Sequence, residues 1–199
     1  MRPIRLLLVD DHGLFRKGLA ALLATEVGFR VVGEACDGLE AIKKTAELKP
    51  DLVLMDIHMP GINGLEATRQ IRESFPATKV VILTVSEEDK DLFEAIKSGA
   101  SGFLIKKVEP NELSSMLRGV FHGEAPISRL TASKILAEFA AREQRLTVPP
   151  DVIEGQLSPR ETGVLGLVAE GLTNKEIGGK LAIEENTVKN HLKNILGKL

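Results

Sequence analysis

An alternation between short apolar runs and segments of helical spacing, repeated five times, most constrains the fold of this chain. The apolar runs are IRLLLV, RVVGEA, DLVLMD, KVVILT and SGFLIK. Five strand–helix units in succession predict a doubly wound α/β domain, with a parallel sheet and helices on both faces. The first, third and fourth runs lack alternation, as expected of central strands buried on both sides. The second run is broken by Gly33 and Glu34, which favours an edge strand.

The pattern changes after residue 123, and we predict three segments: an α/β domain over 1–123, a linker over 124–156 and a smaller all-α domain over 157–199. SRLTASKILAEFAAREQRL in the linker has helical spacing, and TVPPDVIEGQ then breaks any helix. Two capping boxes, SPRE from Ser158 and TNKE from Thr173, mark helix starts in the last segment. Three short helices with a tight turn between the second and third predict a helix-turn-helix.

Composition excludes several classes of function. The net charge is −2, so any signal for nucleic acid must be local. No apolar run approaches the roughly 20 residues of a membrane span, and the start does not resemble a signal peptide; we expect a cytoplasmic protein without membrane contact. The single cysteine, Cys36, cannot form an intramolecular disulfide, and we expect it to be a buried strand residue.

Polar residues with complementary chemistry follow four of the predicted strands. Asp10 and Asp11 follow the first, Asp56 the third, Thr84 ends the fourth and Lys106 follows the fifth. Ligands bind at the carboxyl ends of the strands in doubly wound sheets. Three neighbouring carboxylates need a cation, and a set of oxygen ligands suits Mg²⁺. The arrangement therefore predicts a Mg²⁺-assisted phosphoryl site, with a carboxylate as nucleophile.

Each of these residues also has an ordinary structural explanation. Asp11 could cap the following helix, Thr84 could satisfy backbone groups at a strand end, and Lys106 could be a surface lysine. The occurrence of all of them at matching strand ends favours the functional interpretation.

The motifs LLLVDDH, DLVLMDIHMPGINGLEATRQIR, VVILT and ASGFLIKK resemble the receiver domain of two-component response regulators. The resemblance covers residues 4 to about 123 and implies a flavodoxin-like (βα)5 domain with strand order 2-1-3-4-5. It implies phosphorylation of Asp56 by a sensor histidine kinase. It also implies roles for other residues: Mg²⁺ ligation by Asp10, Asp11, Asp56 and the backbone carbonyl of His58, phosphoryl pairing by Lys106, and switching by Thr84 and Phe103. We further expect His58 and Ser86 to tune how long the phosphoryl group lasts.

The last 43 residues resemble a LuxR-type DNA-binding domain through LSPRE, AEGLTNKEI and TVKNHLKNIL, so the whole chain is similar to NarL/FixJ-type response regulators. Lys189 and Lys193 lie four residues apart, on one face of the expected helix. By resemblance, the base-reading positions are Lys189, Asn190 and Lys193, and the phosphate neighbours are Thr187, Asn174 and Lys175. A solvated lysine face is the alternative.

Some positions depart from the LuxR-type pattern. Glycines stand inside expected helices at Gly163, Gly166, Gly178 and Gly179, and each should cost roughly 0.5–1 kcal/mol relative to alanine. Glu184 stands where a serine commonly caps the recognition helix. The sequence ends before the fourth helix of the family, so we expect the DNA-binding domain to lack its last helix.

Together these features predict a phosphorylation-dependent transcription regulator rather than an enzyme. It would bind double-stranded promoter DNA and form a homodimer when phosphorylated. One alternative is a Mg²⁺-dependent aspartyl-phosphate phosphohydrolase, although His58 stands where such enzymes usually carry a second acid. Another is a receiver module with a vestigial DNA domain.

Overall fold

The structure is a computed structural model that describes residues 2–124, 132–133, 135–137 and 157–198. The chain divides into two compact units, Met1–Gly123 and Glu124–Leu199, and each is described by itself. Of the predicted linker helix, residues 132–133 and 135–137 are helical. The rest of that prediction, including the tether up to residue 156, lies outside the described residues apart from Glu124.

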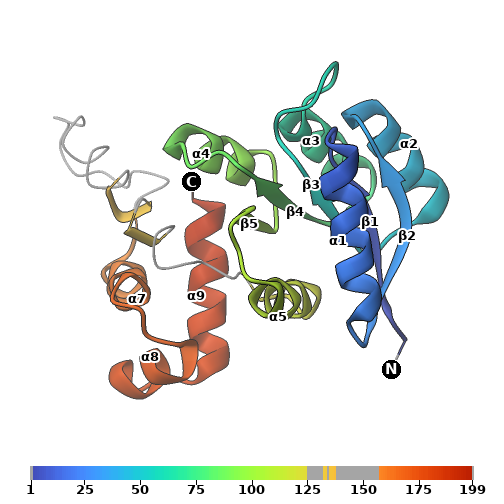
Figure 1. Ribbon diagram of the computed structural model, residues 1–199. Helices are drawn as coiled ribbons and strands as arrows, with labels where there is room; N and C mark the ends of the chain where they lie inside the picture. Colours follow the sequence, from blue (N-terminus) through green and yellow to red (C-terminus); the bar gives the residue numbers. More distant parts are fainter. Residues whose placement is uncertain (1, 125–131, 134, 138–156, 199) are drawn as a thin grey trace, which may run out of the picture. The chain divides into compact units, whose positions relative to one another are not determined.

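The first unit is built on a sheet of five parallel strands in the order β2-β1-β3-β4-β5, which confirms the predicted class and order (Figure 1). The strands are β1 (Ile4–Val9), β2 (Phe29–Ala35), β3 (Leu52–Met55), β4 (Lys79–Thr84) and β5 (Gly102–Ile105). As predicted, β2 is an edge strand, and its middle residues are only partly buried. The strand order changes direction at β1 and β3, so their carboxyl ends flank the crevice where ligands bind in such sheets.

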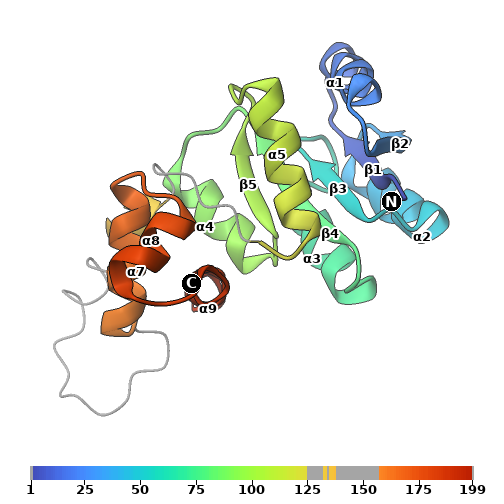
Figure 2. The ribbon, with the colours of Figure 1, turned by 90° about the horizontal axis from the view of Figure 1, so that it is seen from below.

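Five helices cover the two faces of this sheet, as Figure 2 shows. They are α1 (Gly13–Thr25), α2 (Gly38–Leu48), α3 (Gly64–Ser74), α4 (Asp89–Lys97) and α5 (Pro110–Phe121). Helices α1 and α5 pack on one face, and α2, α3 and α4 pack on the other. In β1 the side chains of Leu6 and Leu8 enter the first core, and those of Leu7 and Val9 enter the second. Burial on both faces explains why these strands are uninterrupted apolar runs.

The second unit contains three helices of the predicted helix-turn-helix: α7 (Pro159–Ala169), α8 (Asn174–Leu181) and α9 (Glu185–Gly197). Both predicted capping boxes form, Ser158 with Glu161 and Thr173 with Glu176. Glu184 is the N-cap of α9 and makes no side-chain capping hydrogen bond. The buried apolar residues of the three helices are Val164, Leu165, Val168, Ile177, Val188, Leu192 and Ile195.

The four glycines that the sequence places inside helices of this unit are not equivalent. A Cβ atom at Gly163, Gly166 or Gly179 would meet nothing within 4 Å. At Gly178 it would lie 2.7 Å from the carbonyl oxygen of Ile183, because the turn between α8 and α9 packs directly on this helix. The expectation that every glycine costs stability is therefore wrong for Gly178, where the close backbone approach requires the missing side chain.

No helix in the described parts of the chain has the length and apolar character needed to cross a membrane.

Candidate functional site

The carboxyl edge of the sheet brings polar side chains from four strands together, as the sequence predicts. Asp10 and Asp56 come directly after β1 and β3, Thr84 is the last residue of β4, and Lys106 follows β5. Asp10 is 4% exposed, Asp56 is 3% exposed and Thr84 is completely buried. Burial of charged groups is costly unless they are paired, so this edge must contain a compensating cation.

Lys106 supplies one such cation. Its Nζ lies 2.7 Å from Asp10 Oδ2 and 2.8 Å from Asp56 Oδ2, and the same atom lies over the Phe15 ring, 4.6 Å from the centroid. Burial by itself would lower the pKa of this ammonium, but hydrogen bonds to Asp10 and Asp56 outweigh burial and raise the pKa above 10.5. The alternative of an ordinary surface lysine is excluded, since the side chain is only 10% exposed.

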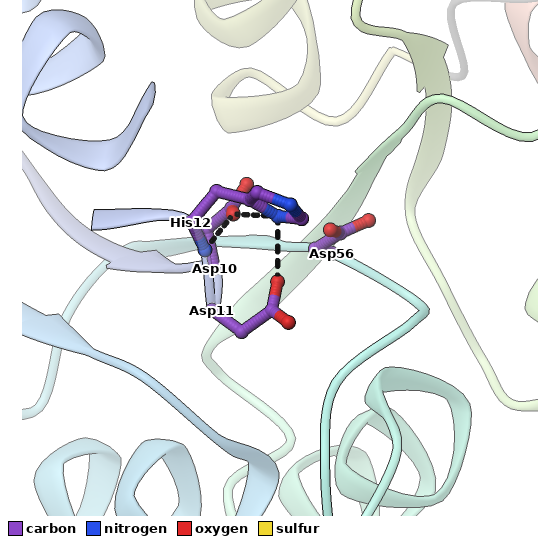
Figure 3. A group of neighbouring side chains, drawn as sticks. All are labelled: Asp10, Asp11, His12 and Asp56. Carbon is purple, nitrogen blue, oxygen red and sulfur yellow. Dashed lines mark hydrogen bonds and ion pairs between the residues drawn. The ribbon is translucent and has the colours of Figure 1, made fainter. Parts of the chain in front are cut away.

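Asp11 and His12 form the rim of the site, as Figure 3 shows. Asp10 Oδ1 accepts the backbone N–H of His12 at 2.8 Å, and His12 Nδ1 lies 2.8 Å from Asp11 Oδ1. The N-cap of α1 is His12, and no side chain makes the capping hydrogen bond. The alternative that Asp11 serves as the helix cap is therefore wrong.

The donor set fits a hard divalent cation. Ligand atoms of Asp10, Asp11, His12 and Asp56 all lie within 4.8 Å of one another. One ammonium against three carboxylates leaves the pocket negative, and two of these carboxylates are buried. Carboxylate oxygens of this number suit Mg²⁺, which uses few protein ligands and keeps several waters. The predicted acidic pocket is present.

The remaining predicted receiver residues surround this pocket. His58 is exposed, and its Nε2 lies 3.2 Å from Asp91 Oδ2 on α4. Thr84 Oγ1 accepts the backbone N–H of Ser86 at 3.2 Å. Phe103 on β5 is partly buried and packs against the core beneath α2, α3 and α4.

Two residues that the sequence interpretation missed contact the backbone of Asp10 and Asp56. Arg16 on α1 donates to the backbone carbonyl of Asp10 and pairs with Glu34 at 2.9 Å. Gly64 begins α3, and a Cβ atom there would lie 1.8 Å from the carbonyl oxygen of Asp56. Gly64 follows the N-cap Asn63, so NG was a visible turn signal, but its contact with Asp56 depends on the fold.

Cys36 is exposed, and the expectation that it lies buried in a strand is wrong. Strand β2 ends at Ala35, so Cys36 belongs to the bend that precedes α2. There its backbone N–H donates to Glu40 at 2.7 Å, as part of the capping of α2 that also uses Asp37.

The predicted DNA-binding residues lie on two helices of the second unit. Asn174 and Lys175 are the first residues of α8, and Thr187, Lys189, Asn190 and Lys193 lie on α9. Lys175, Asn190 and Lys193 are exposed, and the other three are partly buried. Lys189 is paired with Glu185 at 3.2 Å across one helical turn. An exposed face with ammonium and amide groups suits phosphate and base-edge contacts.

Comparison with protein families assigns both units. The model for the response regulator receiver domain matches residues 6–118, and the model for bacterial regulatory proteins of the luxR family matches residues 155–199. The chain belongs to the two-component response regulators. Within this family it combines a receiver with a LuxR-type helix-turn-helix, as the sequence predicts, and it is a phosphorylation-dependent transcription regulator.

Relatives and solved structures agree with this membership. The response regulator is 40% identical over 197 residues to the nitrate/nitrite response regulator protein NarL of Escherichia coli K12, covering 99% of this chain and 89% of the relative. It is 39% identical over 196 residues to the transcriptional regulatory protein LiaR of Bacillus subtilis, covering 98% of this chain and 90% of the relative. A LuxR-family response regulator from Aurantimonas sp. SI85-9A1 superposes with a TM-score of 0.65 at 36% identity, covering 69% of this chain and 99% of that one.

Proposed function

We propose that Asp56 accepts a phosphoryl group from a phosphohistidine of a sensor histidine kinase. The observation that carries this proposal is the buried ion pair between Asp56 Oδ2 and Lys106 Nζ, 2.8 Å apart, at the carboxyl edge of the sheet. The pair fixes one carboxylate oxygen, and the backbone N–H of Ile57 donates to the other at 2.8 Å. Asp56 is thereby held in one orientation, as a positioned nucleophile must be.

The transfer needs no further reactant. A carboxylate oxygen of Asp56 forms a bond to phosphorus while the bond from phosphorus to the kinase imidazole nitrogen breaks, and the electron pair of that bond returns to the imidazole. The product is an acyl phosphate on Asp56. Lys106, already within contact distance, neutralises charge on the phosphoryl oxygens.

We assign the metal ligands to Asp10, Asp11, Asp56 and the backbone carbonyl of His58. Bound there, Mg²⁺ would offset the negative charge that the three carboxylates and the phosphoryl group bring together. The chain's own contribution is to hold Asp10 through the N–H of His12 and the guanidinium of Arg16.

The proposed switch joins the site to the DNA-binding unit. Thr84 would turn its hydroxyl from the Ser86 N–H to the phosphoryl group, and Phe103 would rotate inward. These changes would shift the equilibrium between two conformations of the surface formed by α4, β5 and α5. The conformation favoured by phosphorylation would form a homodimer. A dimer would bind two half-sites of promoter DNA, and the protein would act in the cytoplasm.

For the DNA contacts we assign base reading to Lys189, Asn190 and Lys193 on α9. Phosphate contacts would come from Thr187 and from Asn174 and Lys175, the first two residues of α8. The chain would catalyse at most its own slow phosphorylation and dephosphorylation. The lifetime of the phosphoryl group would depend on Ser86 and on His58, whose ring is paired with Asp91.

Labelling with acetyl phosphate or carbamoyl phosphate tests the phosphoacceptor. Wild type should take up one labile phosphate per chain, and Asp56→Asn should take up none. Glu73→Gln, which alters an exposed carboxylate on α3, is the control and should label as wild type does. Equal labelling of wild type and Asp56→Asn, or none on wild type, would remove Asp56 from this role. Multiple turnover of phosphoesters would instead indicate a phosphohydrolase.

Footprinting on promoter fragments tests the DNA-binding surface. Lys189→Ala and Lys193→Ala should weaken protection, and loss of a phosphate contact lowers the slope of log affinity against log salt by about 1. Lys180→Ala on α8, whose lysine pairs with Glu170, is the control in the same unit. No protection by phosphorylated wild type at low salt would support a vestigial DNA domain.

A further inference from the structure

The imidazole of His12 lies against the carboxylate site with a ring nitrogen facing it (Figure 3). Its Nδ1 is 2.8 Å from Asp11 Oδ1 and 3.6 Å from Asp10 Oδ1. Both carboxylates are among the metal ligands assigned above. The side chain of His12 is 74% exposed, so the ring can adjust its position without disturbing the core.

These separations match the spacing of neighbouring ligands around one ion. Two atoms that each lie about 2.1 Å from a metal, at right angles to each other, are about 3.0 Å apart. The distances from Nδ1 to the Asp11 and Asp10 oxygens lie on either side of this value. The backbone N–H of His12 holds Asp10 Oδ1 at 2.8 Å, which fixes the start of α1 relative to the site.

The other imidazoles of the chain are placed differently. The ring of His58 pairs with Asp91 on α4. His122 follows α5 and stacks edge-on with Phe121, and His191 lies on α9 in the other unit. All four histidines of the sequence lie in the part of the chain that the structure describes, and among them only His12 has a ring nitrogen grouped with the carboxylates of this pocket.

We propose that His12 is a nitrogen ligand of this site that raises its affinity for the divalent transition metals Co²⁺, Ni²⁺ and Zn²⁺. Imidazole nitrogen binds Co²⁺, Ni²⁺ and Zn²⁺ well and adds little for Mg²⁺, which prefers oxygen. A site of three carboxylates and one imidazole therefore binds transition metals more tightly than a site of carboxylates alone. The inference rests on the proposed metal site and adds an imidazole nitrogen to the oxygen ligands assigned there.

Titration of the 199-residue chain with Co²⁺ tests this ligand. Binding would be followed by calorimetry and by the visible d–d absorption of Co²⁺, which responds to a nitrogen ligand. All variants would carry Cys36→Ser, because Cys36, Asp37 and Glu40 form a second group of ligand atoms within 4.8 Å. His12→Asn, which keeps a residue favoured at helix N-caps, and His12→Ala should each weaken Co²⁺ binding about ten-fold or more and change its absorption spectrum.

Two controls separate this inference from the function on which it rests. His122→Ala should leave Co²⁺ binding unchanged, and both His12 variants should bind Mg²⁺ as wild type does. Equal Co²⁺ affinity and identical spectra in wild type and both His12 variants would overturn the role of His12. Asp11→Asn should weaken the binding of both Co²⁺ and Mg²⁺. If Mg²⁺ binds wild type and Asp11→Asn with equal affinity, the proposed metal site itself is wrong.

Discussion

The two functional regions of this response regulator differ in what holds their side chains. Around Asp56 the charged groups are buried and contact one another, with Lys106 bridging two carboxylates from different strands. On α9 the side chains of Asn190 and Lys193 are exposed, and the helix alone sets their positions. The receiver site is a buried network, whereas the DNA-binding side chains lie at the surface of α9, where Lys189 pairs with Glu185.

This difference determines how each region responds to substitution. Groups in a buried network depend on one another, and removing one leaves another charge without compensation. Exposed charges are screened by water and act nearly independently. Substitutions should therefore reduce stability in the receiver site, and reduce affinity without loss of stability on α9.

The largest effect should come from Lys106→Met, which keeps the apolar stem beside Phe15 and removes the charge between Asp10 and Asp56. We expect the free energy of unfolding of the receiver to fall by about 2 kcal/mol, because two nearly buried carboxylates would remain without a counter-charge. The fall would be larger for an ion pair fully enclosed in the protein. Combining the change with Asp56→Asn, or adding Mg²⁺, should recover much of this loss. The chain has no Trp or Tyr, so hydrogen exchange of β1 and β3 is the suitable measurement.

The adjacent lysine is the matched control for this experiment. Lys107 is 82% exposed on its side chain and pairs with Glu87 at the surface, so Lys107→Met should leave hydrogen exchange in β1 and β3 unchanged. If both variants lost the same protection from hydrogen exchange, the site would not be a buried network. The receiver site would then not differ from α9 in this respect.

A smaller effect is expected from Gly178→Ala, within the second unit. A Cβ atom would lie 2.7 Å from the carbonyl oxygen of Ile183, so the turn before α9 must shift, at a cost of about 1–2 kcal/mol. Gly179→Ala is the control one residue along, with open space around its Cβ, and it should stabilise α8 by about 0.5–1 kcal/mol. Hydrogen exchange across α8 and α9 measures both. If both substitutions stabilised the unit, the turn before α9 would be able to move away from a Cβ atom at little cost in free energy.

Much of the receiver could be predicted from the sequence, because its strands are buried on both faces. Such strands are uninterrupted apolar runs, and the first polar residue after each run marks the carboxyl edge. The sequence therefore predicts correctly that Asp10, Asp56 and Lys106 lie at this edge. The capping boxes of α7 and α8 were equally visible, since their signal lies within four consecutive residues.

The features that the sequence did not reveal depend on contacts between distant segments. The pairing of His58 with Asp91 joins residues 33 positions apart, and the contact of Gly64 with the Asp56 carbonyl depends on how α3 packs. The expectation for Cys36 is wrong because the apolar residues before it suggest that the strand continues, whereas β2 ends at Ala35. Strand ends and side-chain directions follow from tertiary packing, which local propensity describes poorly.

The smallest effect, and the one that tests the second unit for buried electrostatics, concerns Glu161. This carboxylate is 4% exposed, accepts the Ser158 N–H at 2.7 Å and pairs with Lys198 at 2.6 Å. Burial by itself would raise its pKa, but the hydrogen bonds from Lys198 and Ser158 outweigh burial, so the pKa lies below the usual 4.5. Glu161→Gln should cost about 1 kcal/mol at pH 7, the typical value of a helix cap.

The pH dependence of the stability lost in Glu161→Gln shows whether the charge of Glu161 is its cause. A carboxyl whose pKa is lowered by folding stabilises fully above its unfolded pKa, near 4.5, and the stabilisation disappears as the pH falls through the lowered folded value. The difference between wild type and Glu161→Gln in hydrogen exchange of α7 should therefore narrow below about pH 4.5. Glu176→Gln alters the equivalent capping box at an exposed position and should have a smaller effect. A loss that stays constant with pH would indicate that shape, rather than charge, fixes this helix end, and the second unit would then lack any counterpart of the Lys106 network.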